Sequence, residues 1–235
     1  MPNSPLEEAD DQLDFSFVLA SSVHDMKNSL GMLLHTLEDM LAQTPPENEA
    51  QRRTFAVLGY EASRINSELV RLLSLYRLQH ESLRVHLDEH FVADTLEDQL
   101  DRNDVLFQAR GLTAEVICDP SLKWYYDSEL IGGIINNVLV NGARYSTEHL
   151  QVRASEDQGT LCIAIADDGD GYPQSMLDAP FEPNAGVSFS NGSTNLGLLF
   201  AHRVAEMHRV NGRQGSLRLE NNGPLGGGVL TLRLP

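Results

Sequence analysis

The chain of 235 residues is predicted to form an α-helical hairpin, which pairs into a dimeric four-helix bundle, followed by a two-layer α+β domain. Two observations predict the helical part. Two long runs carry apolar residues alternately three and four positions apart, and a proline-containing break separates them. A third observation predicts the second part: from about residue 82, short strand-like runs alternate with helix-like runs.

The first 13 residues are acidic and polar, so we expect a disordered tail there and no signal peptide. Residues 14–81 are expected to form the hairpin, because the break at Thr44–Asn48 is short enough to make the two runs antiparallel neighbours. A lone hairpin leaves apolar surface uncovered, so a homodimer is expected; a hairpin covered by the rest of its own chain is the alternative. The seam positions are Val23, Met26, Leu30, Leu33, Leu37 and Met40, and Phe55, Leu58, Ala62, Ile65, Leu69, Leu72 and Tyr76.

Residues 82–235 are expected to form one sheet covered by helices, since the apolar pattern now changes between period two and the helical period. Helices are predicted near 92–108, 127–143 and 196–208. The strand-like runs are Leu83–Leu87, Leu112–Ile117, Leu150–Ala154, Leu161–Ala166, Ser216–Leu219 and Val229–Leu234.

Acidic residues outnumber basic ones by 34 to 17, giving a net charge of −17. That excess argues against nucleic acid or an anionic membrane as a partner, because both require clustered Lys and Arg. Cys118 and Cys162 lie far apart without metal-ligand spacing, and no run of eighteen apolar residues occurs. A reduced, cytoplasmic setting without a membrane span is therefore expected.

An acidic, glycine-rich turn, DDGDGYP at 167–173, follows the apolar run CIAIA. Asp167 at the end of a strand can accept a hydrogen bond from an exocyclic amine such as that of adenine. Gly169 and Gly171 allow the backbone to approach a flat ligand closely. An ordinary turn between strands is the plainer interpretation of this motif alone.

A second motif, NVLVNGARY at 137–145, places Asn137, Asn141, Arg144 and Tyr145 near one face of a helix. Buried amides are costly unless they are hydrogen-bonded, and the amide oxygen of Asn141 is a hard ligand suited to Mg²⁺. Arg144 can neutralise phosphate and Tyr145 can stack on a base. A helix with two polar positions bonded to its own backbone explains the pattern equally well.

Two glycine-containing segments follow. The run GSTNLGL at 192–198 opens the helix LLFAHRVAEMH, whose first N–H groups can bind phosphate; an ordinary N-capped turn is the alternative. The run GGGVLTLRLP at 226–235 predicts a glycine turn into a final strand. The four motifs in this order are far more specific together than singly.

One histidine has a distinctive context, SVHDMKNSL at 22–30, inside the first helical run. His24 follows the seam residue Val23 and should lie at the bundle surface. Asp25 is its neighbour, and Asn28 lies one helical turn further on. The plain alternative is an ordinary surface histidine, as for the other seven, of which His208 is expected to be structural.

The chain resembles the bacterial sensor histidine kinases over nearly its whole length. Residues 23–30 resemble the family's H box and 137–145 its N box, while Asp167, Gly169 and Gly171 match its G1 box. Phe181–Pro183 resemble the F box, 192–198 the G2 box and 226–235 the last glycine box.

The resemblance implies a Bergerat-fold ATP-binding domain at 82–235 and a dimerisation and phosphotransfer bundle at 14–81. It implies ATP and Mg²⁺ as cofactors, with His24 as the phosphoacceptor, Asp25 assisting it, and Asn28 orienting a water that hydrolyses a partner's phosphoryl-aspartate. The implied nucleotide-binding residues are Asn137, Asn141 (also the metal ligand), Arg144, Tyr145, Asp167, Gly169, Gly171, Thr194, Gly197 and Leu198.

The implied partner is a response-regulator receiver domain, with an upstream sensor protein as a further one.

Two departures of this sequence from the family's motifs bear on its activity. Asn195 stands where the family usually has the first glycine of its G2 box, and no Lys or Arg occurs between Arg153 and Arg203, a span that includes the expected lid at about 174–194. Two alternatives therefore stay open: a phosphotransfer protein or phosphatase with a degenerate ATP domain, and a binding module that sequesters a partner.

Overall fold

The computed structural model describes residues 84–179, 181 and 196–235, and scattered positions between 26 and 65. The chain divides into two compact units, Met1–His80 and Glu81–Pro235. Of the predicted positions, His24, Asp25, Thr194, Asn195 and most of the expected lid lie outside the described residues. Each unit is considered by itself below.

In the first unit, described positions of both predicted helical runs are helical, from Met26 to Leu41 and from Gln51 to Ile65, although the hairpin as a whole stays a prediction. The break between them is not helical at Pro46, as expected for proline. A Cβ atom placed on Gly59 would lie 3.6 Å from Leu37 Cδ2, so the two runs are in contact there.

The second unit is built on a five-stranded mixed sheet in the order β2-β4-β5-β9-β8. Only β2 and β4 pair in parallel; the other neighbours are antiparallel. In β5 and β9 alternate side chains are fully buried, which is the period expected of strands with one covered face. The strands are β2 (Thr113–Ile117), β4 (His149–Glu156), β5 (Leu161–Asp167), β8 (Ser216–Asn221) and β9 (Gly228–Leu234).

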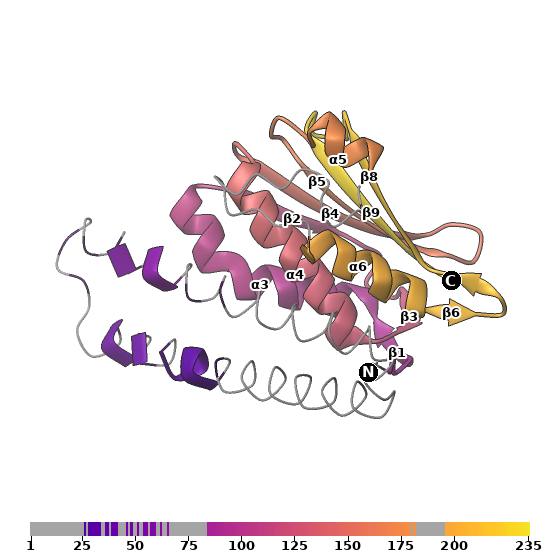
Figure 1. The fold of residues 1–235 in the computed structure, drawn as a ribbon, viewed down its shortest axis with the longest axis horizontal. Helices are drawn as coiled ribbons and strands as arrows, with labels where there is room; N and C mark the ends of the chain where they lie inside the picture. Colours follow the sequence, from indigo (N-terminus) through magenta and orange to yellow (C-terminus); the bar gives the residue numbers. More distant parts are fainter. Residues whose placement is uncertain are drawn as a thin grey trace, which may run out of the picture. The chain divides into compact units, whose positions relative to one another are not determined.

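Three helices lie side by side on one face of this sheet: α3 (Val92–Arg110), α4 (Ser128–Tyr145) and α6 (Leu196–Met207) (Figure 1). Their predicted ranges agree with the observed ones to within two residues. The predicted two-layer α+β architecture is confirmed for this domain, whose core is the aliphatic layer between helices and sheet. A short helix, α5 (Gln174–Asp178), follows β5 and was not predicted.

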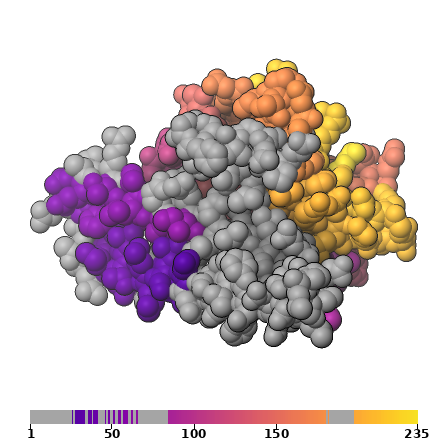
Figure 2. All heavy atoms as spheres, in the orientation of Figure 1, coloured from indigo at the N-terminus to yellow at the C-terminus, as the bar shows by residue number. Residues whose placement is uncertain are grey.

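Two small antiparallel ribbons complete the domain. They are β1 (Asp88–Phe91) with β3 (Lys123–Tyr126), and β6 (Arg209–Val210) with β7 (Arg213–Gln214). The prediction of a strand at 83–87 was wrong, because residues 84–87 carry no regular structure and the strand begins at Asp88. In Figure 2, the golden atoms of α6 and of the β6–β7 ribbon form one continuous area of the face shown.

A buried polar contact fixes α4 against α3. Gln99 and Asn103 of α3 are both at least nine-tenths buried. The Asn103 side-chain amide donates to the Gln99 carbonyl oxygen at 2.7 Å and to Asn136 Oδ1 of α4 at 2.8 Å. Because misaligned helices would break the bond between Asn103 and Asn136, this contact favours one position of α4 along α3. No helix in the described parts of the chain is long and apolar enough to cross a membrane.

Candidate nucleotide-binding site

Asp167, at the end of β5, is held by the backbone of β9. Its Oδ1 accepts hydrogen bonds from the N–H groups of Gly169 at 2.9 Å and Gly228 at 3.0 Å. The Gly227 N–H donates to the Asp167 backbone oxygen at 3.1 Å. Among the described residues no donor reaches Oδ2. The half-buried carboxylate is therefore fixed through one oxygen and can accept a ligand's N–H through the other.

Glycine is required at 169 and 171 for packing within the protein. A Cβ on Gly169 would lie 2.3 Å from the carbonyl oxygen of Tyr145, so the turn after β5 is pressed against the end of α4. Gly171 has a φ of 78°, and a Cβ there would lie 2.6 Å from Asn221 Oδ1. Only glycine fits both places without displacing its neighbour.

Asn221 was not identified from the sequence. Its Oδ1 accepts from the Tyr172 N–H at 2.7 Å and its Nδ2 donates to the Tyr172 oxygen at 2.9 Å. The amide thus reproduces the pairing of a neighbouring strand and fixes the exit of the turn to β8. Burial, with a smaller effect of the Asp167 charge, raises the pKa of the Tyr172 hydroxyl well above its ordinary value.

Asp168 was also missed, and it fixes the loop between α4 and β4. Its carboxylate accepts backbone N–H bonds from Thr147, Glu148 and His149 at 2.8, 2.9 and 3.0 Å. Partial burial disfavours its charged form, but the three N–H donors together outweigh that effect and hold its pKa below the ordinary value. The turn is thus tied to α4 on one side and to β9 on the other.

The asparagines of α4 have unequal environments. Asn137 is 3% exposed, and a Cβ on Gly197 of α6 would lie 2.5 Å from its Nδ2, so the two helices touch there. Asn141 is exposed, and its Nδ2 donates to Asn137 Oδ1 at 3.3 Å. Among the described residues nothing donates to Asn141 Oδ1. Asn137 therefore orients Asn141 through its amide nitrogen and leaves the Asn141 carbonyl oxygen available to a cation.

The other predicted binding residues lie near these contacts. Arg144 and Tyr145 are exposed at the last turn of α4, with the guanidinium carbon 5.6 Å from the centre of the tyrosine ring. Gly197 and Leu198 are buried in the first turn of α6. Three contacts thus join four sequence motifs: Tyr145 with Gly169, Asn137 with Gly197, and Asp167 with Gly228.

The F-box phenylalanine has a specific partner that the sequence did not reveal. The ring of Phe181 stacks on that of His202 of α6, with centres 4.0 Å apart and planes 2° from parallel. His202 Nδ1 is buried and has no hydrogen-bond partner among the described residues, and Nε2 lies 3.5 Å from Glu206 Oε1. Burial lowers the pKa of His202, and the charge of Glu206 partly opposes that change.

A nucleotide with a magnesium ion fits the residues present. Asp167 Oδ2, to which no described residue donates, suits an exocyclic amine, and the amide oxygen of the exposed Asn141 suits Mg²⁺. The described residues contain no group of three or more His, Cys, Asp or Glu that could hold a metal ion by themselves. A cation at Asn141 would therefore take its remaining ligands from phosphate and water, as Mg²⁺ commonly does.

Comparison with known proteins agrees with this geometry. Residues 126–235 match the family of histidine kinase-, DNA gyrase B- and HSP90-like ATPases. The chain is 23% identical over 194 residues to the sensor protein PhoQ of Escherichia coli (strain K12), a match that covers 81% of this chain and 38% of PhoQ. The virulence sensor histidine kinase PhoQ of Salmonella typhimurium (strain LT2) is 21% identical over 190 residues, with the same coverage. The chain thus spans well under half the length of these relatives.

Solved structures support the fold. The Acinetobacter baumannii histidine kinase AdeS superposes with a TM-score of 0.59 at 18% identity, over 90% of this chain and 96% of that one. Full-length ShkA in complex with AMPPNP superposes with a TM-score of 0.65 at 18% identity, over 92% of this chain and 45% of that one. The predicted resemblance is confirmed: residues 126–235 match the family of histidine kinase-, DNA gyrase B- and HSP90-like ATPases, and the chain is similar to sensor histidine kinases over most of its length.

Proposed function

We propose that this chain is the catalytic core of a cytoplasmic histidine kinase. ATP bound with Mg²⁺ in residues 82–235 donates its γ-phosphoryl group to His24 in residues 14–81, and a response-regulator aspartate then receives it. The observation that carries the proposal is the set of three contacts joining Asp167, α4 and the start of α6. An upstream sensor protein would supply the signal.

In the nucleotide site, each group has a chemical task. Asp167 Oδ2 accepts the exocyclic amine of adenine, and Tyr145 lies against the base. Asn141 would hold Mg²⁺, Arg144 would neutralise phosphate charge, and the backbone N–H groups at the start of α6 would donate to phosphate oxygens. Thr194, Gly197 and Leu198 belong to that segment.

At the acceptor, a nitrogen lone pair of His24 attacks the γ-phosphorus of ATP. The new N–P bond forms as the bond to the bridging oxygen breaks and ADP leaves. Asp25 accepts the ring proton or a hydrogen bond from the other nitrogen, which raises nucleophilicity. Asn28, at an exposed helical position, is assigned to the reverse chemistry, orienting water toward a partner's phosphoryl-aspartate.

Incubation with labelled ATP and Mg²⁺ tests the kinase proposal directly. Label appearing on the protein supports it. ATP binding without label would favour a binding module, and neither binding nor label would favour a phosphotransfer protein or phosphatase with a degenerate ATP domain.

The absence of Lys and Arg between Arg153 and Arg203 favours the phosphotransfer protein or phosphatase with a degenerate ATP domain as the second candidate. Positive charge near the phosphates must then come from Mg²⁺, Arg144 and N–H groups.

Exposure along the predicted seam supports a homodimer. The described seam residues include five whose side chains expose between 48% and 54% of their surface: Met26, Leu33, Met40, Leu58 and Ile65. A second copy would bury these apolar side chains in a four-helix bundle.

Replacing Leu69 by aspartate should convert the dimer into a monomer, because an unpaired charge in the seam costs several kcal/mol, roughly, per subunit. Sedimentation of the full chain at micromolar concentration measures the change. Ser67→Asp adds the same charge two positions away from the seam and should leave the dimer intact. A wild-type chain that sediments as a monomer would rule out the bundle.

Replacing Asn28 by alanine should slow dephosphorylation of the partner by roughly a hundredfold, the scale of a lost positioning group in proton-transfer chemistry. Labelling of His24 by ATP should stay close to the wild-type level, because the amide is not needed for attack on ATP. The neighbouring Ser29→Ala provides the matched control. Loss of phosphate at the wild-type rate in Asn28→Ala would mean that the Asn28 amide has no part in the hydrolysis.

A further inference from the structure

His208, one position past the end of α6, is 1% exposed and bonded through both ring nitrogens. Its Nδ1 lies 2.8 Å from the carbonyl oxygen of Val204 and must carry the proton, since a carbonyl can only accept. Its Nε2 is then an acceptor, and the backbone N–H of Asp127 donates to it at 3.2 Å. These contacts require the neutral ring.

Asp127 joins His208 to two further segments. It is 8% exposed and caps α4, its Oδ1 accepting from the Leu130 N–H at 3.0 Å. Its Oδ2 accepts from the N–H of His86 at 3.0 Å. The start of α4, the end of α6 and the segment before β1 therefore meet at one buried residue, Asp127, which bonds the first and third through its carboxylate and His208 through its backbone N–H.

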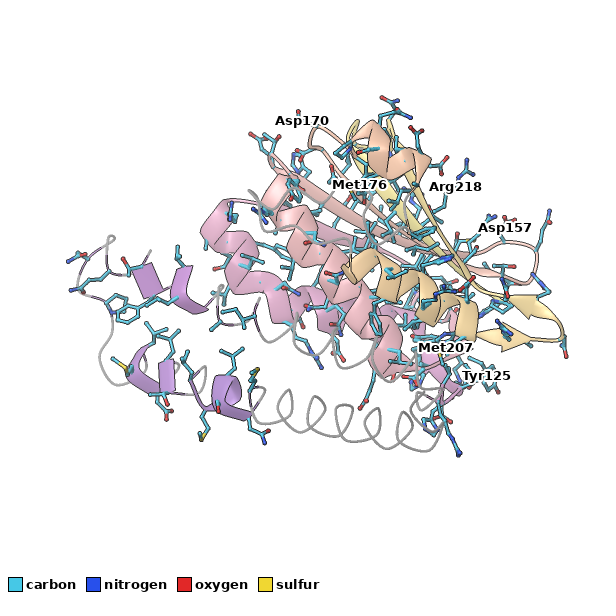
Figure 3. The ribbon with its side chains drawn as sticks, viewed as in Figure 1. Tyr125, Asp157, Asp170, Met176, Met207 and Arg218 are labelled. Carbon is cyan, nitrogen blue, oxygen red and sulfur yellow. The ribbon has the colours of Figure 1, made fainter. Side chains whose placement is uncertain are left out.

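This meeting point and the contact between Asn137 and Gly197 hold α4 and α6 at two separate places. The helices run antiparallel, so the end of α6 lies beside the start of α4, whereas the nucleotide-site contact is at the opposite end of α6. In Figure 3, Tyr125 and Met207, which are close in sequence to Asp127 and His208, lie at the end of the domain remote from Asp170. Two separated contacts fix both the angle and the register of two helices.

We propose that His208 and Asp127 are positioning residues of the nucleotide site, which hold the remote ends of α4 and α6 and so fix Asn141 relative to Gly197. The inference rests on the proposed ATP site. Protonation of His208 at Nε2 would set one N–H against another and remove the contact with Asp127. The helices would then be held at one place only, and the population aligned for nucleotide binding would fall.

The direction of the pH effect follows from the environment. Burial lowers the pKa of His208, and the bond to Val204 and the charge of Asp127 partly oppose this. A neutral native histidine contributes stability that is complete above its ordinary pKa of about 6.5 and is lost as pH falls through the lowered value. Among the neighbouring charged or titratable side chains, Tyr126 bonds Thr95, Glu206 pairs with Arg203, Arg209 donates to the Glu206 backbone oxygen and Arg213 donates to Thr160. His86, in the segment before β1, and Glu129, in the first turn of α4, are exposed.

The test is calorimetric titration of the full chain with ATP and Mg²⁺ at about pH 7.5 and about pH 5.5. His208→Gln retains an acceptor for the Asp127 N–H but cannot titrate, so it should bind as wild type does at the higher pH and lose less affinity at the lower. His208→Leu leaves that N–H unpaired and should bind about tenfold more weakly at the higher pH. The γ-phosphate of ATP titrates in the same range for every variant, so the difference between wild type and His208→Gln is the measurement.

His149→Gln, an exposed histidine on β4, should keep the wild-type pH profile. Equal affinities and equal pH profiles for wild type and both His208 variants would overturn the positioning role. If His208→Leu does not fold, the comparison of pH profiles with His208→Gln decides alone. If wild type binds no nucleotide, the proposed function fails, and the positioning role is then tested by amide hydrogen exchange around Asn137. Faster exchange in His208→Leu than in His208→Gln supports the positioning role, and equal exchange rates overturn it.

Discussion

Replacing His24 by alanine is expected to abolish labelling of the protein by ATP while nucleotide binding stays unchanged. The proposed nucleophile belongs to residues 14–81, whereas every proposed nucleotide contact belongs to residues 82–235, so the two activities should separate. Labelling is measured after denaturing electrophoresis, and a phosphohistidine is recognised by the lability of its N–P bond in acid.

His35→Ala, which removes another histidine of the same predicted helix, is the matched control and should label as wild type does. Persistent labelling of His24→Ala would place the phosphoacceptor elsewhere. Loss of both labelling and binding would mean that the substitution perturbs the whole chain and that the two activities are not separable in this way.

Replacing Asp167 by asparagine is expected to weaken ATP binding by at least about thirtyfold. The Asn Oδ1 can still accept from Gly169 and Gly228, so the turn keeps its fold, but Nδ2 then directs a donor toward the donor amine of adenine. Two facing donors in a partly buried site cost about 2 kcal/mol or more. Calorimetric titration measures the affinity.

Asp170→Asn removes an exposed carboxylate from the same turn and should leave ATP affinity within about twofold of wild type, as a surface change away from the ligand does. Thermal unfolding of both variants checks that the domain is intact. Equal affinities for the two variants would mean that Asp167 does not contact the nucleotide and that the site has been misplaced.

The helices of the second unit were predictable because their apolar periodicity is a local property. The run at 127–143 appears as α4 at Ser128–Tyr145, and the apolar run at 161–166 appears as β5. β1 could not be predicted, because its sequence DEHF has no apolar alternation and its strand conformation depends on pairing with β3. The same holds for the two-residue strands β6 and β7.

The site could be predicted as a set of motifs but not as a set of contacts. A glycine in a turn signals that something approaches closely, yet the sequence cannot say that Gly169 faces the Tyr145 carbonyl or that Gly171 faces Asn221. Asp168 was overlooked for a related reason: its partners are backbone N–H groups about twenty positions earlier. Any residue type except proline can supply a backbone N–H, so the sequence does not indicate such a contact.

β9 is the last strand along the chain, yet it lies between β5 and β8 in the sheet. Until it is in place, β5 has an open edge, and Asp167 lacks the Gly228 N–H that lies 61 positions further on. Pairings over such separations are slow to form, since the intervening loop must be closed before any contact compensates for its lost entropy. Folding of this domain should therefore be slow and cooperative, and a chain synthesised only as far as α6 exposes a hydrophobic strand edge on which a chaperone, or another unfinished chain, can act.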